Sequence, residues 1–208
     1  MINNFKHKFC INLDRRKDKW EQCQDEFIKH DIQNVIRISG VDGNPENLPN
    51  KMIRQPIITN IGCTLSHLNI LQYAQEKNLE NIVVFEDDCV FVDDFNEKFN
   101  YYFSQIPNDW DMIYFSGTHI GGMDSVKKNV WRTLGTWTSH SYIMNRSVYQ
   151  RYIDLLSKLT DVVDVIYQIQ HTLIKAYILL PHLTYQREGI SDIQKTFTNY
   201  KELKNLCK

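Results

Sequence analysis

Apolar positions recur along the chain with two spacings. Leu65, Leu68 and Leu71 fall on one face of a helix, whereas 82–85 is an unbroken apolar run between polar residues. The first spacing predicts an amphipathic helix, and the second predicts a short strand covered on both faces. Extended over the chain, these spacings predict strands at 9–13, 35–38, 82–85, 111–115, 140–144 and 176–180, and helices at 18–29, 64–76, 95–106 and 148–159.

The strand-like and helix-like segments follow one another in sequence. Such alternation is typical of an α/β fold in which helices cover a mixed, mostly parallel sheet. Pro45, Pro49 and Pro56 interrupt the pattern, so we expect an irregular loop at 44–59. Gly121 and Gly122 lie in a second expected loop, 118–124, which we predict to be mobile and able to close over a ligand.

Composition narrows the class of protein. Of 208 residues 42% are hydrophobic, enough for one sizeable core, so we expect a single domain over 1–208. The 24 basic residues nearly balance the 25 acidic ones, which argues against binding to nucleic acid. The polar amino terminus does not resemble a signal peptide, and we expect no transmembrane segment, which takes roughly 18 apolar residues.

The five cysteines are scattered and form neither a C-x-x-C pair nor a zinc-ligand pattern. We expect four of them to be small buried apolar residues. This usage favours a reducing compartment, so we predict a cytoplasmic protein, either free or peripheral at a membrane surface. The pattern indicates no oligomeric state.

Three acids follow the apolar run at 82–85 in the stretch NIVVFEDDCVF. Ligands of α/β sheets bind at the carboxyl ends of strands, where Glu86, Asp87 and Asp88 fall. Alternation along an extended chain puts Glu86 and Asp88 on one side and Asp87 on the other. Two such carboxylates repel each other by about 4 kcal/mol at 4 Å and an effective dielectric of 20, a cost that a divalent cation would remove.

Oxygen ligands suit Mg²⁺ or Mn²⁺. We predict that Asp88 binds the metal directly and that Glu86 helps, through water or by contacting another part of the ligand. The alternative is a solvated strand end in which Asp87 or Asp88 caps the next turn.

Seven blocks extend this hypothesis over most of the chain. They are CINLDRRKDKW, ISGVDG, IGCTLSHLNILQYAQEKNLENIVVFEDDCVF, WDMIYFSG, SHSYIMNRSVYQRYI, VVDVIYQI and YQREGISDI. In this order they resemble the glycosyltransferases of family 25, most specifically in G-C-x-L-S-H followed by a helix, an apolar strand and E-D-D. The resemblance implies a GT-A-like, Rossmann-like fold and a metal-dependent inverting enzyme that uses Mn²⁺ or Mg²⁺. Such an enzyme moves galactose or glucose from a UDP-sugar to a hydroxyl of a glycan or glycoprotein.

The resemblance also implies roles for particular residues. The triplet at 86–88 matches the family's D-x-D-type element, which holds metal and donor, and Glu86 is expected on the metal or the ribose. The other positions expected to bind the donor are Ile11, Asn12, Leu13 and Arg15 of the first-strand loop, Ser66 and His67 of the S-H pair, and Asp192 of the late S-D-I element.

Asp164 is the expected catalytic base. It matches the family's P-V-D block, although Val162 and Val163 stand where proline and valine are commoner. An aspartate in an apolar helix is expected to have a raised pKa, which suits a base. The alternative is a capping or salt-bridged aspartate, although Asp161 is better placed as the cap. Asp87 is kept as a second catalytic candidate, but its opposite orientation favours a structural role.

Other residues retain two interpretations each. Arg15 and Arg16 either meet the donor diphosphate or form a solvated helix entry, and His67 either contacts the donor or is a satisfied core residue. Trp131 and Trp137 either stack on a sugar or pack in the core. We expect residues 1–120 to bind the donor and residues 121–208 to face the acceptor.

Other protein classes fit less well. The absence of G-x-G-x-x-G and of Gly-Lys-Ser/Thr argues against nicotinamide and P-loop proteins. A receiver domain would carry its acid pair after the first strand, not at 86–88. A non-catalytic module that binds a nucleotide sugar or a glycan remains the alternative. The chain length favours a glycan over a hydroxylysine-type acceptor.

Overall fold

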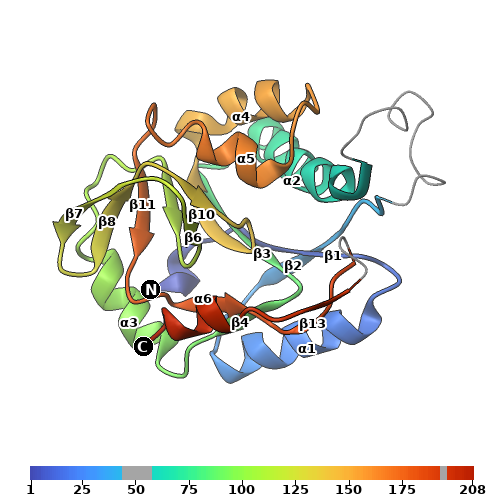
Figure 1. Cartoon of the computed structure of the whole chain (residues 1–208), viewed down its shortest axis with the longest axis horizontal. Helices are drawn as coiled ribbons and strands as arrows, with labels where there is room; N and C mark the ends of the chain where they lie inside the picture. The colour runs from blue at the N-terminus through green and yellow to red at the C-terminus, as the bar shows by residue number, and fades with distance from the viewer. Residues whose placement is uncertain (44–57, 193–195) are drawn as a thin grey trace.

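The computed structural model describes residues 1–43, 58–192 and 196–208. Within them an eight-stranded sheet has the order β2-β1-β3-β10-β5-β11-β8-β7 (Figure 1). Its strands are β1 (Lys8–Asn12), β2 (Val35–Ser39), β3 (Asn81–Glu86), β5 (Met112–Tyr114), β7 (Met123–Lys127), β8 (Val130–Thr133), β10 (Ser141–Asn145) and β11 (Ala176–Leu179). Strands β10 and β8 run against the others, so the predicted α/β fold with a mixed, mostly parallel sheet is confirmed.

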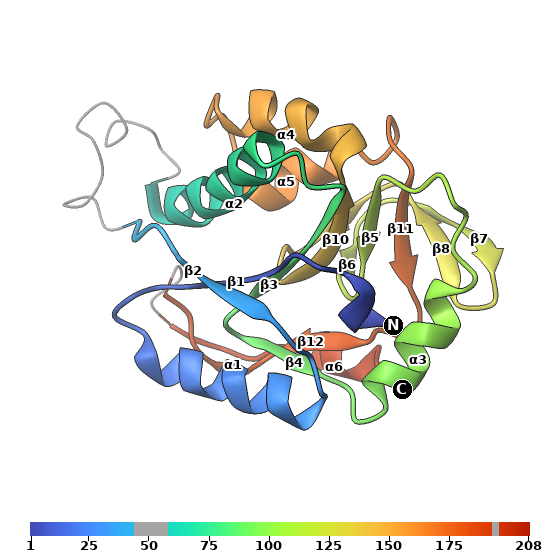
Figure 2. The same ribbon diagram turned by 180° about the vertical axis from the view of Figure 1, so that it is seen from behind.

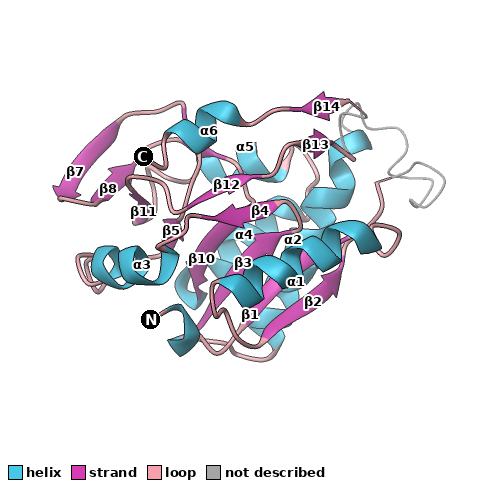
Figure 3. Ribbon diagram, turned by 90° about the horizontal axis from the view of Figure 1, so that it is seen from below, coloured by secondary structure: helices cyan, strands magenta, loops and turns pink. Residues whose placement is uncertain are grey.

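Helices cover both faces of the sheet. They are α1 (Lys17–Lys29), α2 (Ile58–Glu76), α3 (Phe95–Phe103), α4 (Tyr149–Leu156), α5 (Val163–Gln168) and α6 (Lys201–Asn205), with 3-10 turns η1 (Ile2–Asn4) and η3 (Arg146–Val148). Helices α2, α4 and α5 lie on one face, and α1 and α3 on the other (Figures 1 and 2). Figure 3 shows α1 crossing β1, β2 and β3 on this second face.

The two faces of β3 explain its unbroken apolar run. Val83 and Phe85 pack in the cluster beneath α1 and α3, whereas Ile82 and Val84 pack in the cluster beneath α2, α4 and α5. All four side chains are fully buried. A strand with helices on both faces needs apolar residues at every position, which is why no polar alternation appears.

Three short strand pairs lie outside the large sheet. They are β4 (Cys89–Phe91) with β12 (Thr184–Gln186), β6 (Thr118–His119) with β9 (Thr136–Trp137), and β13 (Gly189–Ile190) with β14 (Phe197–Thr198). Segments of two or three residues carry no measurable period, so the sequence pattern did not predict them.

Several expectations need correction. The segment 118–124 is not a mobile loop, because it contains β6 and the start of β7, and Gly121 N donates to Gly135 O at 3.1 Å. Helix α2 begins at Ile58, inside the expected loop 44–59, whose residues 44–57 lie outside the described part of the chain.

The cysteines follow the prediction only in part. All five are free, and Cys10, Cys23 and Cys89 are buried, but Cys63 and Cys207 are partly exposed. Among the helices that the structure describes, none has the length and apolar character needed to cross a bilayer.

Candidate active site

A cavity of about 430 Å³ opens where β1 and β3 end side by side. Because these strands are parallel, Asn12 and Glu86 reach the same edge of the sheet. The walls come from segments that are distant in sequence: 11–16, 40–43, 62–66, 86–88, 186–192 and 198–200. All predicted site residues except His67 and Asp164 line this cavity. Both expected halves of the chain contribute to it.

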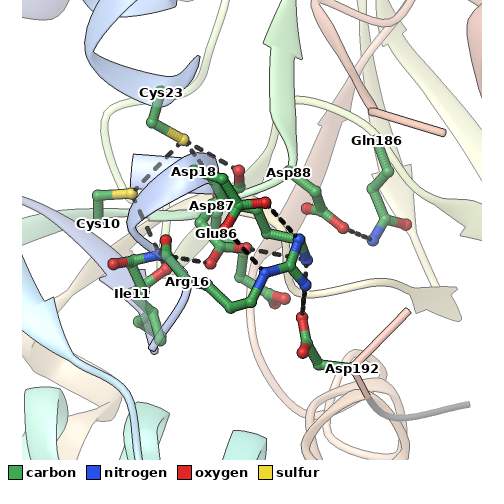
Figure 4. A network of polar contacts seen from close by, with 12 residues as sticks. Cys10, Ile11, Arg16, Asp18, Cys23, Glu86, Asp87, Asp88, Gln186 and Asp192 are labelled. Carbon is green, nitrogen blue, oxygen red and sulfur yellow. Dashed lines mark hydrogen bonds and ion pairs between the residues drawn. The ribbon is translucent and has the colours of Figure 1, made fainter. Parts of the chain in front are cut away.

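The three acids point in different directions (Figure 4). Strand β3 ends at Glu86, and Asp87 and Asp88 form a turn before β4. Glu86 bonds toward α2, Asp87 toward β1, and Asp88 toward β12. The expectation that Glu86 and Asp88 share one side was wrong, because side-chain alternation stops where the extended strand stops.

Glu86 is held from behind by two side chains. Its Oε1 accepts a hydrogen bond from Ser139 Oγ at 2.6 Å and lies 3.3 Å from His67 Nε2. Burial would raise the pKa of Glu86, but His67 and Ser139 together bring it below its ordinary value. His67 is fully buried, and its Nδ1 lies 2.9 Å from the hydroxyl of Tyr142. His67 therefore supports Glu86 from the core and does not reach the cavity.

Asp88 is the least satisfied acid of the triplet. Its Oδ2 accepts from Gln186 Nε2 at 3.1 Å, while Oδ1 is buried and has no hydrogen-bond partner among the described residues. Burial and the charges of Glu86 and Asp87 raise the pKa of Asp88 to about 7. An added cation would satisfy this oxygen and stabilise the ionised form, so the oxygen ligands here fit Mg²⁺ or Mn²⁺.

A second group of metal-ligating atoms lies beside the triplet. Ligand atoms of Cys63, His67 and Glu86 lie within 4.8 Å of one another. Burial raises the pKa of the Cys63 thiol well above its ordinary value, and the charge of Glu86 adds to this effect. Since the thiol stays protonated and His67 already contacts Glu86, this group is best described as a closed hydrogen-bonded support.

Asp87 joins the acid turn to the amino-terminal segments. Its Oδ2 accepts from Asn12 Nδ2 at 2.7 Å, and its Oδ1 lies 3.4 Å from Lys19 Nζ. Asn12 also donates to the backbone oxygen of Arg16 and accepts from Arg37 Nε. The contacts of Asp87 match the structural role that its expected orientation favoured.

Three cations in the cavity converge on one carboxylate. Arg15 Nη1 lies 2.6 Å from Asp192 Oδ1, and both Arg16 Nη1 and Lys19 Nζ contact Asp192 Oδ2, the latter at 3.1 Å. Figure 4 shows the contact of Arg16 with Asp192. Burial would raise the pKa of Asp192, but Arg15 and Lys19 bring it below its ordinary value. The side chains of Lys19 and Arg16 are only 18% and 20% exposed, so these two do not form a solvated helix entry, whereas the Arg15 side chain is 45% exposed.

Ser66 fixes a wall of the cavity. Its hydroxyl accepts from the backbone N–H of Val41 at 2.8 Å and donates to the backbone oxygen of Gly62 at 2.7 Å. A Cβ on Gly62 would lie 2.4 Å from the oxygen of Val41, so helix and loop touch through their backbones. In this structure Ser66 holds the loop at 40–43, and its contact with the donor stays a prediction.

Asp164 lies in the first turn of α5, behind Glu86. Its Oδ1 is buried and has no hydrogen-bond partner within the described chain. Burial and the charge of Glu86 raise its pKa to about 6, against an opposing effect of the Ser139 hydroxyl. Asp161 does not cap α5, because the N-cap is Val162 and Asp161 Oδ1 accepts from Val162 N. A carboxylate with a free oxygen and a near-neutral pKa can act as a base.

Three contributors were missed by sequence reasoning: Lys19, Ser139 and Gln186. Lys19 was visible in the basic run DRRKDK, and Gln186 lies in the block YQREGISDI, yet nothing local marks either one as facing a cavity. Ser139 lies in a polar run just before β10, which gave the only hint of its contact with Glu86.

The two tryptophans have different environments. Trp131, in β8, packs against the core cluster beneath α2 and α4, in line with the core-packing interpretation. Trp137, in β9, is 41% exposed and is not a core residue.

Comparison with known proteins identifies the family. The model of glycosyltransferase family 25 (LPS biosynthesis protein) matches residues 5–149. The chain belongs to glycosyltransferase family 25. Two relatives illustrate the range of this family. A procollagen lysyl hydroxylase and glycosyltransferase of Acanthamoeba polyphaga mimivirus is 32% identical over 129 residues, which are 51% of this chain and 14% of the relative. The probable inactive glycosyltransferase 25 family member 3 of Bos taurus is 28% identical over 133 residues, 56% of this chain and 22% of the relative.

Mouse procollagen galactosyltransferase 2 is 31% identical over 130 residues, 53% of this family 25 chain and 20% of the relative. The matched region thus spans 20% of the mouse relative's length and 14% of the viral relative's length. Among solved structures, a glycosyltransferase involved in the glycosylation of the major capsid of PBCV-1 has a TM-score of 0.52 at 9% identity, covering 91% of this chain and 96% of the other. This last similarity concerns the fold alone.

Proposed function

We propose that this chain is a metal-dependent, inverting glycosyltransferase that moves galactose or glucose from a UDP-sugar to a hydroxyl of a glycan or glycoprotein. One observation carries the proposal: Asp88 Oδ1, which has no hydrogen-bond partner in the described part of the chain, belongs to a cavity that also holds three converging cations. A carboxylate that needs a cation and a cation cluster that can hold an anion are the two halves of a site for a metal diphosphate.

The donor fits the cavity in size and chemistry. A volume of about 430 Å³ lies within the usual range for small-molecule sites, roughly 300–1,000 Å³. In our proposal the diphosphate takes the place of the Asp192 carboxylate on Arg15, Arg16 and Lys19. Ile11, Leu13 and the 40–43 loop then flank the nucleoside.

Metal binding falls to the acids. Asp88 would hold Mn²⁺ or Mg²⁺ directly, with Glu86 beside it, and the bound ion would supply positive charge next to the diphosphate. The Arg15, Arg16 and Lys19 side chains stabilise the negative charge that develops on the departing UDP.

Asp164 is the proposed base. The acceptor oxygen bonds to the anomeric carbon as the bond from that carbon to the diphosphate oxygen breaks, and UDP leaves with the electron pair. Asp164 takes the proton of the acceptor hydroxyl during this step. A pKa of about 6 leaves the carboxylate ionised at neutral pH, yet basic enough to accept a proton.

The acceptor and setting are part of the same proposal. Relatives named for procollagen support a hydroxylysine-type acceptor, whereas the family description names LPS biosynthesis and supports a glycan. We favour the glycan, with the reaction in the cytoplasm.

The test compares wild type with Asp88→Asn in UDP-galactose, UDP-glucose and UDP, each with Mn²⁺. Ligand at 100 times Kd stabilises by about 2.7 kcal/mol, which raises Tm by roughly 5–11 °C. We expect Asp88→Asn to lose the Mn²⁺-dependent part of this shift and at least about 100-fold in donor turnover, the scale of losing one transition-state electrostatic contact. The control Asp93→Asn changes an acid whose side chain is 92% exposed and lies outside the cavity.

Two outcomes would change the conclusion. If a broad panel of nucleotide sugars gave neither stabilisation nor hydrolysis, the proposed donor site would be wrong. Stabilisation without hydrolysis or transfer would favour the non-catalytic binding module, as the name of the probable inactive bovine relative suggests for that protein.

A further inference from the structure

An exposed aromatic residue lies on a strand that contacts α5, the helix of the proposed base. Trp137 ends β9, and its side chain is 41% exposed, while Ser139, two residues later, donates to Glu86 at 2.6 Å. Two extended residues span at most about 7 Å, so the Trp137 backbone lies within that distance of the Ser139 backbone. Ser139 also contributes to the environment of Asp164. Strand β9 also contacts α5, the helix that carries Asp164, so the Trp137 backbone lies near the place where acceptor chemistry is proposed to occur.

The residue between them is strained and unsatisfied. Thr138 has a φ of 86°, a left-handed conformation that a β-branched residue rarely adopts. Its hydroxyl is buried, yet it has no hydrogen-bond partner in the described part of the chain. Both features are unfavourable for stability, and they coincide on one residue beside the proposed base. Strained residues cluster at active sites and ligand-binding sites, and a buried unsatisfied group calls for an explanation.

The surrounding structure enforces this conformation. A Cβ on Gly117 would lie 2.3 Å from the Thr136 side chain and 2.7 Å from the oxygen of Trp137, so β6 and β9 approach as closely as backbones allow. Thr136 is held in turn, since its backbone N–H donates to His171 Nδ1 and its hydroxyl contacts Thr133. The turn is thus rigidly built, with Trp137 presented to solvent.

These groups complement a sugar ring. An indole face packs against the C–H face of a pyranose, and the Thr138 hydroxyl and Asp164 Oδ1 are buried polar atoms whose hydrogen bonds are unmet among the described residues. We propose that Trp137 and Thr138 form the acceptor subsite and that its occupant is a pyranose, stacked on Trp137 with its reacting hydroxyl toward Asp164. This inference rests on the proposed function and names its acceptor class.

The experiment uses methyl β-galactopyranoside and methyl β-glucopyranoside as acceptor probes, with the UDP-sugars and Mn²⁺. If a glycoside raises the rate of UDP release above the rate of donor hydrolysis without acceptor, the difference measures transfer to that glycoside. We expect Trp137→Ala to raise the acceptor KM at least tenfold, with donor KM and donor hydrolysis within twofold of wild type. The acceptor KM of Trp137→Phe should lie between that of wild type and that of Trp137→Ala. Tyr101→Ala, which removes a 53% exposed aromatic residue on α3, is the matched control and should change nothing.

Thr138→Val separates function from folding, because it keeps the β-branched shape and removes the hydroxyl. We expect its acceptor KM to rise while its Tm holds or increases, since an unsatisfied buried group has been removed. Saturation-transfer NMR of the same glycosides gives a readout without turnover: ring C–H signals should appear with wild type and disappear with Trp137→Ala.

The proposal and the donor site fail in different ways. Three results would overturn the acceptor subsite and leave donor binding intact. They are an unchanged acceptor KM in Trp137→Ala, a lower Tm with an unchanged acceptor KM in Thr138→Val, and no saturation transfer from the wild-type protein to the glycosides. Transfer to a hydroxylysine peptide but to no glycoside also overturns it. If wild type neither binds nor hydrolyses any donor, the proposed function fails first, and the acceptor subsite fails with it.

Discussion

Asp192 is the acid whose position differs most from its expected role. It was expected to orient a ligand, yet its carboxylate occupies the cation cluster that the diphosphate is proposed to use. Under the proposed function the diphosphate would take these three cations, so we expect Asp192 to compete with the donor. Its affinity for the cluster is part of the cost of loading the donor.

Asp192→Asn should therefore bind UDP more tightly. Removing the competing charge is expected to lower Kd about 3- to 10-fold, equivalent to about 0.7–1.4 kcal/mol. Isothermal calorimetry with UDP and Mn²⁺ measures it. Asp18→Asn is the control, because Asp18 also pairs with Arg16 but is 58% exposed and outside the cavity. Weaker binding by Asp192→Asn would mean that Asp192 organises the cations and does not compete.

Asp164 links the proposed chemistry to stability. Its pKa of about 6 in the folded protein exceeds the ordinary value of 3.8, so the folded state binds this proton more tightly than the unfolded state. The raised pKa of Asp164 therefore favours folding at low pH, and this contribution to the free energy of unfolding is lost as pH rises through about 6. At neutral pH the ionised carboxylate therefore reduces stability.

Asp164→Asn should be more stable than wild type at pH 7.5, by about 1–3 kcal/mol. The difference should shrink between pH 6 and pH 4, where wild type becomes protonated. Urea unfolding at several pH values measures it, and transfer activity should fall in wild type below pH 6 as the base is protonated. A stability difference that is equal at pH 4.5 and pH 7.5 would contradict the assigned pKa.

Helix α2 and the 40–43 loop form one wall through direct backbone contact. Gly62 permits that contact, and the Ser66 hydroxyl bridges Gly62 and Val41. Because nothing larger than hydrogen fits at 62, the position of the loop depends on this one side chain. The partners of Gly62 are Val41 and Gly43, which lie about twenty positions earlier in the chain, so the local sequence could not show this contact.

Gly62→Ala should displace the loop and reduce both stability and UDP affinity. Overpacking costs about 1–3 kcal/mol, which lowers Tm by roughly 2–12 °C. Gly122→Ala is the matched control, because its added Cβ would meet only Leu134 Cδ1, at an ordinary 3.5 Å. Thermal unfolding with and without UDP separates the two effects. An unchanged Tm in Gly62→Ala would show that the loop adjusts freely.

The whole molecule brings the donor site together from the two ends of the chain. The large sheet holds β1 and β3 in register, and β12 carries the segment 186–192 across to the same cavity. The formal net charge of −1 gives no long-range attraction for an anion, so binding depends on these local contacts.

Hydrogen exchange should reveal this shared site. UDP with Mn²⁺ is expected to protect peptides that contain 11–16, 86–88 and 186–192 together, because one ligand contacts all three. Peptides from α3, on the other side of β4, should exchange as before. Mass spectrometry of the exchanged peptides measures it, and protection confined to one of the three segments would contradict a single composite site.

Local pattern was sufficient for the fold class and for the acids at 86–88, and the family resemblance supplied the other predicted residues of the cavity wall. The apolar periods of 65–71 and 82–85 depend on backbone geometry alone, so they identified helix and strand without knowledge of neighbours. The position of 86–88 at a strand end placed the acids at the sheet edge, and residues 5–149 carry the family match.

Long-range packing decided the rest. The turn at Asp87 and Asp88 ended the alternation that had put Glu86 and Asp88 together, and only folding brought Asp192 onto Arg15. No local pattern records which distant charge a side chain meets, because ion pairs such as this one join residues 177 positions apart. The family of the chain can therefore be identified from its sequence. The separate roles of its acids depend on tertiary contacts, which no short stretch of sequence contains.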